Sequence, residues 1–147
     1  MEAFVPTRTP APLAGTQILA LDAQSGLQVV EQLSRGLLTD SVEQLAAHLG
    51  LPVTQVLELA DIKSSTFHNR KKTRQPLTPE ASERVYRLAK VVEAAEAYFE
   101  DAAQAHRWLM HGKVALGGAV PLTFARSAEG AEYVVNLLGR MAHGVIS

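Results

Sequence analysis

Residues 57–74, LELADIKSSTFHNRKKTR, combine the spacing of a helix-turn-helix with a run of positive charge. Such a motif needs an apolar or small residue in its first helix and, about four positions later, a turn residue that tolerates a positive φ. An apolar residue comes next, and another follows about five positions further on. The four positions hold Leu57, Asp61, Ile62 and Phe67. Aspartate is an acceptable left-handed residue, so the pattern predicts a second helix from Lys63 to about Lys72.

A second register of the same motif also fits the chain. It is formed by Ala46, Gly50, Leu51 and Val56. Gly50 suits a left-handed turn better than Asp61 does, but the recognition helix of this register, residues 53–60, has Glu58 as its only charge. DNA phosphates would repel that helix. We therefore expect the helix that begins near Lys63 to read the DNA, with residues 40–49 as a supporting helix.

The segment from Lys63 to Arg74 holds five positive charges and no acidic residue, although the whole chain of 147 residues has a formal net charge of −1. This contrast favours one localised surface for a polyanion over a protein that coats nucleic acid with its whole surface. Phe67 is expected in the core, and hydroxyl, amide and imidazole groups add base-edge hydrogen bonding. The predicted DNA contacts are Lys63, Ser64, Ser65, Thr66, His68, Asn69, Arg70, Lys71, Lys72 and Arg74.

Helical periodicity and capping residues cover the rest of the chain, and no sustained alternating pattern is present, so the predicted fold is all α. The expected helix starts are a capping box of Asp40 and Glu43, then Thr78-Pro79, Asp101 and Ser127. The basic residues of the helix after Thr78, which are Arg84, Arg87 and Lys90, either extend the basic surface or pair with Glu80 and Glu83. The last helix is expected to bury Ala131, Val134, Val135, Leu138 and Met141, with Gly130 at a close helix crossing and Trp108 as a core anchor.

Three segments follow from this pattern. Residues 1–24 are rich in proline and small residues, which predicts a flexible or loosely docked arm. Residues 25–99 form the expected helix-turn-helix domain, and residues 100–147 a small helical domain.

Several function classes are excluded or disfavoured. No cysteine is present for a disulfide or a thiolate metal site, and His106 and His111 lack a carboxylate at ligand spacing, so no metal site is predicted. No motif of a nucleophile or a phosphate loop occurs, so neither catalysis nor a cofactor is expected. The chain shows no secretion signal, and its apolar stretches are too short to span a membrane. We expect a cytoplasmic protein.

Several linked motifs resemble the Xre-type antitoxins of Xre/RES toxin-antitoxin modules, which include the MbcA and ParS proteins. The similarity runs from about Leu27 to the C-terminus. It is carried by LTPEASERVYRLA at 77–89, AHRWL at 105–109, ALGGAVPL at 115–122, Glu129-Gly-Ala, Val134, Leu138-Gly-Arg and His143-Gly-Val. Where family members commonly have two arginines after the threonine of the recognition helix, this chain has His68-Asn-Arg70. Its operator contacts are therefore expected to differ.

The resemblance implies a Cro-like DNA-binding half and a C-terminal half that neutralises a RES-domain toxin, an enzyme that depletes NAD. In that family the complex of antitoxin and toxin also binds operator DNA and represses its own operon. We expect a homodimer, so that two recognition helices meet a palindromic site. The implied toxin contacts are Leu116, Pro121, Leu122, Arg140, His143, Gly144, Val145, Ile146 and Ser147, with the tail near the toxin's active-site cleft. The alternative is a stand-alone transcriptional regulator whose C-terminal half binds an effector or only dimerises.

Overall fold

The computed structural model describes residues 15–144, and in this range the chain is helical without a strand, as the sequence predicts. The helices are α1 (Gly26–Arg35), α2 (Asp40–Leu49), α3 (Val53–Leu59), α4 (Ser64–Lys72), α5 (Pro79–Phe99), α6 (Ala102–Met110), the 3-10 turn η1 (Val114–Leu116), α7 (Pro121–Phe124) and α8 (Ala128–Ala142). None of the helices described is long and apolar enough to cross a membrane.

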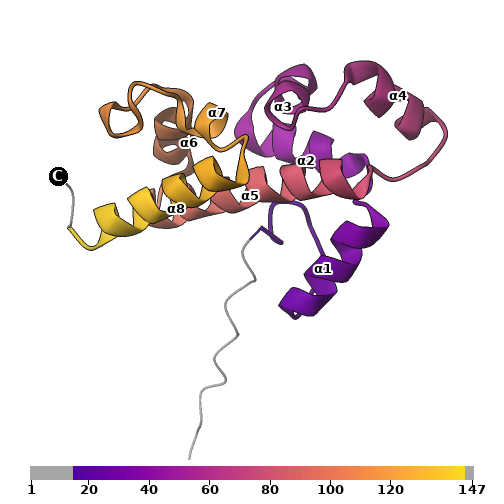
Figure 1. The fold of residues 1–147 in the computed structure, drawn as a ribbon, viewed down its shortest axis with the longest axis horizontal. Coiled ribbons are helices and arrows are strands. Elements are labelled where there is room, and N and C mark those ends of the chain that lie inside the picture. Colours follow the sequence, from indigo (N-terminus) through magenta and orange to yellow (C-terminus); the bar gives the residue numbers. More distant parts are fainter. Residues whose placement is uncertain (1–14, 145–147) are drawn as a thin grey trace, which may run out of the picture.

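Helix α5 is the spine on which both halves of the molecule pack (Figure 1). Its 21 residues run past α2 near one end and past α6 and α8 toward the other. The helix buries small and branched side chains along most of its length, namely Ala81, Ser82, Val85, Leu88, Ala89, Val91, Val92 and Ala95. One continuous apolar core therefore extends from the helix-turn-helix into the C-terminal half.

Most helix starts follow the expected capping chemistry. The side chains of Thr78, Asp101 and Ser127 each accept a hydrogen bond from the backbone N–H three residues later, which satisfies one of the unpaired donors of a helix start. The capping box predicted for α2 is wrong. Thr39 is the N-cap and its side chain makes no capping bond, because the first free N–H groups donate to the carbonyls of Leu38 and Thr39 instead.

The buried face of α8 differs by a small rotation from the predicted one. Gly130, Ala131, Val134, Leu137 and Leu138 are buried, whereas Val135 is 38% exposed and Met141 is only partly buried. Gly130 does mark a close approach, but to the last carbonyl of α7. A Cβ atom there would lie 1.7 Å from the carbonyl oxygen of Phe124. This contact fixes the rotation of α8, and the sequence pattern alone could not place it.

Residues 15–21, which belong to the segment predicted as a flexible or loosely docked arm, are docked on α5. The Glu93 carboxylate accepts hydrogen bonds from the backbone N–H groups of Gly15, Gln17 and Ile18, the last two over 3.0 and 3.1 Å. Leu19 is only 2% exposed. Residues 1–14 of the expected arm lie outside the described part of the chain.

Candidate functional site

Helix α4 lies at one extremity of the molecule, far from the end of α8 (Figure 1). Phe67 anchors it in the core with 1% of its surface exposed, as the sequence predicts. The other predicted DNA contacts are exposed, except Arg70, which is half-buried. The structure thus brings the basic and polar residues of this segment together on one projecting element.

Both helix-turn-helix registers have a left-handed turn residue. Gly50 has a φ of 67° and Asp61 a φ of 53°, and in each turn the next residue donates its N–H to a carbonyl of the preceding helix. Turn geometry therefore does not distinguish the registers. The difference lies in charge, because α3 exposes Glu58 whereas α4 and the residues that flank it expose Lys63, Lys72 and Arg74.

Arg84 holds the turn between α3 and α4. Its Nε donates to the carbonyl oxygen of Ala60 over 2.6 Å, and its Nη2 donates to that of Asp61 over 3.2 Å. Carbonyls at a helix C-terminus have no partner within the helix, so the guanidinium supplies one. These two bonds favour a positioning role for Arg84 over the hypothesis that it extends the basic surface.

The other two basic residues of α5 are also engaged within the chain. Arg87 lies 3.9 Å from a Glu83 carboxylate oxygen, the pairing that helical spacing suggested, and it also donates to the carbonyl oxygen of Arg126. The Lys90 ammonium lies 5.0 Å from the centre of the Tyr86 ring. The side chains of both residues therefore already have partners within the described part of the chain.

Two of the five cations in the predicted recognition segment have partners inside the chain. Arg70 donates from Nη1 to the carbonyl oxygen of Pro76 over 2.7 Å, and the Lys71 ammonium lies 2.6 Å from Glu43. The cations Lys63, Lys72 and Arg74 form no ion pair with another residue that the structure describes. They are therefore the cations most available to phosphate.

The C-terminal candidates divide into buried and exposed residues. Leu116, Pro121 and Leu122 are buried, so their side chains build the core beneath η1 and α7 and do not reach the surface. Arg140 is exposed and its guanidinium lies 5.6 Å from the centre of the Tyr133 ring. His143 and Gly144 are exposed at the end of α8, whereas Val145, Ile146 and Ser147 lie outside the described residues.

A groove of about 670 Å³ runs between α5 and α8 and is completed by Gln17. Its apolar floor comes from Val91, Ala94, Ala97, Ala131 and Val135, and its rim carries Glu83, Arg87, Lys90, Glu93 and Glu132. Nearby, burial and then the negative charge of Glu93 raise the pKa of Tyr86 above its ordinary value, so its phenol stays neutral at physiological pH.

Sequence reasoning missed two exposed apolar side chains of the C-terminal half. Val114 is 98% exposed on η1, and Tyr133 is 45% exposed on α8. Tyr133 also lines a smaller hollow of about 530 Å³ beside α7, together with Phe124. The signal that the sequence offered for such exposure was an apolar residue outside the buried face of its helix. Trp108, expected in the core, is only half-buried, with its ring 6.0 Å from that of Phe99.

The structure also brings together side chains that the sequence kept apart. No carboxylate lies at ligand spacing from His106 in the sequence, but in the structure its Nε2 lies 2.9 Å from Glu96 Oε2. The same oxygen lies 2.7 Å from His48 Nε2. Sequence spacing could not show this cluster, because the residues come from three different helices.

Two family models match the chain in succession. The antitoxin Xre-like helix-turn-helix domain matches residues 28–90, and the antitoxin Xre/MbcA/ParS C-terminal toxin-binding domain matches residues 94–144. The chain belongs to the Xre/MbcA/ParS antitoxin family. The two matches meet within α5, earlier than the boundary predicted after residue 99. The matched models describe a helix-turn-helix domain and a toxin-binding domain, and neither is a catalytic domain.

Curated relatives agree with this assignment. An "Antitoxin Xre" of Yersinia enterocolitica serotype O:8 is 29% identical over the full length of both chains. An "Antitoxin Xre" of Pseudomonas putida is 32% identical over 90 residues, which are 61% of this chain and 54% of the relative. A "Prs ADP-ribosylating antitoxin" of Sphingobium sp. strain YBL2 is 25% identical over 137 residues, which cover 87% and 86% of the two chains. The chain is therefore an antitoxin of a toxin-antitoxin system and has a toxin as its partner.

Proposed function

We propose that this antitoxin neutralises a RES-domain toxin with its C-terminal half and, as a homodimer, binds operator DNA through α4 to repress its own operon. A protein that binds chromosomal DNA acts beside the chromosome, so the proposal places it in the cytoplasm. The observation that carries the DNA half is a projecting helix whose exposed residues are polar or basic and whose single large apolar side chain, Phe67, is buried.

The chemistry of α4 fits recognition of the major groove. Ser64, Ser65 and Thr66 form its first turn, where a recognition helix meets base edges. One turn later, Asn69 offers an amide that can pair with adenine in bidentate fashion. Lys63, Lys72 and Arg74 flank these groups and suit the phosphate backbone. Arg70 is the weaker candidate for guanine, since its guanidinium already binds Pro76.

The toxin half of the proposal rests on exposed apolar surface in the domain that matches the toxin-binding model. Val135 lines the groove between α5 and α8, and Tyr133 and Val114 lie exposed on α8 and η1. Exposed apolar groups beside a groove are typical of protein interaction sites. The predicted contacts Arg140, His143 and Gly144 lie on the same helix or directly after it. In the proposal, the tail that follows reaches the cleft of the toxin.

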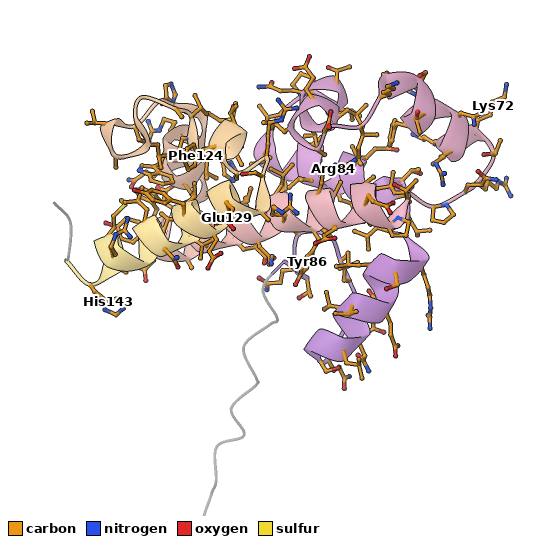
Figure 2. The ribbon with its side chains drawn as sticks, viewed as in Figure 1. Lys72, Arg84, Tyr86, Phe124, Glu129 and His143 are labelled. Carbon is orange, nitrogen blue, oxygen red and sulfur yellow. The ribbon has the colours of Figure 1, made fainter. Side chains whose placement is uncertain are left out.

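The proposed contacts with DNA and with the toxin tail lie far apart on the molecule. Lys72 and His143 lie at the two ends of its long axis (Figure 2), so DNA and toxin can bind without competing for the same surface. Homodimerisation would set two copies of α4 about 34 Å apart for a palindromic site. Helix α1 offers an apolar surface for this contact, because Leu27 is 71% and Val30 is 58% exposed.

The toxin proposal is tested by co-expression with the open reading frame adjacent to the antitoxin gene. The neighbouring protein alone should stop growth and deplete cellular NAD, and this chain should restore both and co-purify with its partner. A neighbour that is harmless alone, or toxic without being rescued, would contradict the proposal.

The DNA proposal is tested separately with a fragment from upstream of the same gene. With three free cations per protomer, the plot of log affinity against log salt should have a slope of roughly −5 for a dimer. An affinity for DNA that does not change with salt concentration would contradict the DNA proposal. A chain that binds this DNA but no adjacent toxin would be a stand-alone regulator.

A further inference from the structure

Three potential metal ligands from three helices meet where the two halves of the molecule join. His48 lies near the end of α2, Glu96 in the last turn of α5 and His106 in the middle of α6. Oε2 of Glu96 lies 2.7 Å from His48 Nε2 and 2.9 Å from His106 Nε2. The other carboxylate oxygen, Oε1, lies 2.9 Å from the same nitrogen of His48. One atom of each residue can be chosen so that all three lie within 4.8 Å of one another.

We propose that His48, Glu96 and His106 form a binding site for a divalent transition-metal ion, with Zn²⁺ as the favoured ion. Two imidazole nitrogens and one carboxylate oxygen, with a water as the fourth ligand, are a known zinc set. Imidazole also selects against Mg²⁺ and Ca²⁺, which prefer oxygen ligands.

The geometry lies close to what zinc requires. Ligands at about 2.0–2.1 Å in a tetrahedron stand about 3.3 Å apart, whereas Glu96 Oε2 lies 2.7 and 2.9 Å from the two nitrogens. A rotation of the long Glu96 side chain would lengthen both distances to the value that zinc requires. Both Nε2 atoms face the same oxygen, Glu96 Oε2. The two imidazole rings, with centroids 5.5 Å apart and an inclination of 64°, meet edge to face and not in parallel.

The exposure of the cluster also suits a metal ion. The side chains of His48, Glu96 and His106 are 35%, 20% and 20% exposed, which leaves a path for the ion and room for a water ligand. At the same time each residue is held on a helix that packs against α5 or is α5 itself. Ligands fixed in this way lose little conformational freedom on binding, which favours affinity.

A metal ion here would join the two functional halves. His48 lies in the region that matches the helix-turn-helix model, and Glu96 and His106 lie in the region that matches the toxin-binding model. The ion would cross-link α2 to α5 and α6, in addition to the apolar core. Because an ion that binds only the folded state shifts the folding equilibrium, occupancy stabilises the junction between the two halves.

The experiment uses the full chain without an affinity tag, stripped with EDTA. Titration with ZnCl₂ should show saturable 1:1 binding, and a free concentration of a hundred times Kd should raise Tm by about 5–10 °C. MgCl₂ should leave Tm unchanged. Cobalt should give the visible absorption bands of a four-coordinate site, which report the ligands independently of stability.

The variants His48→Gln, Glu96→Gln and His106→Gln each keep a polar side chain but remove one ligand. Each should weaken zinc binding by at least about tenfold and abolish the cobalt bands. His111→Gln is the matched control, because His111 is exposed and its ring bonds only to the carbonyl of Arg107 among the described residues. It should bind as the natural chain does.

No saturable zinc binding, or binding that survives the loss of any of the three ligands, would overturn the proposal. Circular dichroism establishes that each variant is folded. The side chain of His48 is the most exposed of the three, at 35%, so His48→Gln is the variant least able to disturb the core. If the other two variants fail to fold, the zinc affinity and cobalt spectrum of His48→Gln test the proposal.

Discussion

Nε of Arg84 donates a 2.6 Å hydrogen bond to the carbonyl oxygen of Ala60, the C-cap residue of α3. The same guanidinium also reaches the carbonyl of Asp61, the left-handed turn residue. Arg84 belongs to α5, so this contact fixes the helix-turn-helix turn relative to the spine of the molecule. The direction in which α4 projects therefore depends on a residue that lies outside the motif.

Replacement of Arg84 by alanine should weaken DNA binding without removing a phosphate contact. Loss of a hydrogen bond from a charged donor should lower the free energy of unfolding by about 1.5–3 kcal/mol, measured by urea denaturation. Operator affinity should fall because α4 is no longer held, while the salt slope of binding stays the same. Arg107→Ala, at an exposed position of α6, should change neither quantity. A shallower slope for Arg84→Ala would instead identify Arg84 as a phosphate contact.

Substitution of Lys72 or Arg74 should have the opposite effect to substitution of Arg84: it should change the salt slope of DNA binding and leave stability unchanged. Both cations are exposed and have no ion pair within the described structure, so Lys72→Ala or Arg74→Ala should reduce the salt slope by about 0.9 per contact of each protomer. Stability should be unchanged. Fluorescence anisotropy with labelled operator at several salt concentrations measures both affinity and slope. Equal slopes for the natural chain and both variants would place the phosphate contacts elsewhere.

Asn69→Ala should reduce sequence preference while leaving general affinity for DNA. Asn69 is exposed on α4, and loss of one bidentate base contact costs about 1–3 kcal/mol of discrimination. The measurement is the ratio of affinities for operator and for a scrambled duplex at one salt concentration. Arg70→Ala is a poor test of base readout, because the side chain also holds the loop at Pro76. An unchanged ratio for Asn69→Ala would place base readout elsewhere.

Local features of the fold were predictable from the sequence. The starts of α5, α6 and α8 depend on a capping residue and the N–H three positions later, and the order of helices follows from periodicity. The helix-turn-helix motif predicts a left-handed residue at Asp61, and its φ is 53°. Such features depend on neighbours within one helical turn, which is the information that a sequence shows directly.

Features that depend on packing between distant segments were not predictable. The contact of Arg84 with Ala60, the ion pair of Lys71 with Glu43 and the cluster around Glu96 each join different helices. The buried face of α8 was partly misassigned for the same reason, because the carbonyl of Phe124 sets its rotation. Predicted contacts at Leu116 and Leu122 ignored burial, which only the packed core determines.

Gly130 and Gly139 should respond oppositely to alanine, although both lie within α8. A Cβ atom at Gly130 would overlap the carbonyl oxygen of Phe124, whereas nothing lies within 4 Å of one at Gly139. Gly130→Ala should lower the free energy of unfolding by at least about 2 kcal/mol. Gly139→Ala should raise it by about 0.5–1 kcal/mol, because alanine favours the helix. Urea denaturation measures both, and a Gly130→Ala variant as stable as the natural chain would contradict the close contact between α8 and α7.

Val135→Glu should impair toxin neutralisation if the groove between α5 and α8 receives the toxin. Val135 is 38% exposed and lines that groove, so a carboxylate there opposes burial against an apolar partner surface. Because the residue is not in the core, the free energy of unfolding should change by less than about 0.5 kcal/mol.

Asn136→Glu is the matched control, since it adds the same charge at the next, exposed position of α8, which does not line the groove. Growth rescue and pull-down with the adjacent toxin should fail for Val135→Glu alone. If both variants rescue equally, the toxin binds another face, and the exposed Tyr133 and Val114 become the residues to change next.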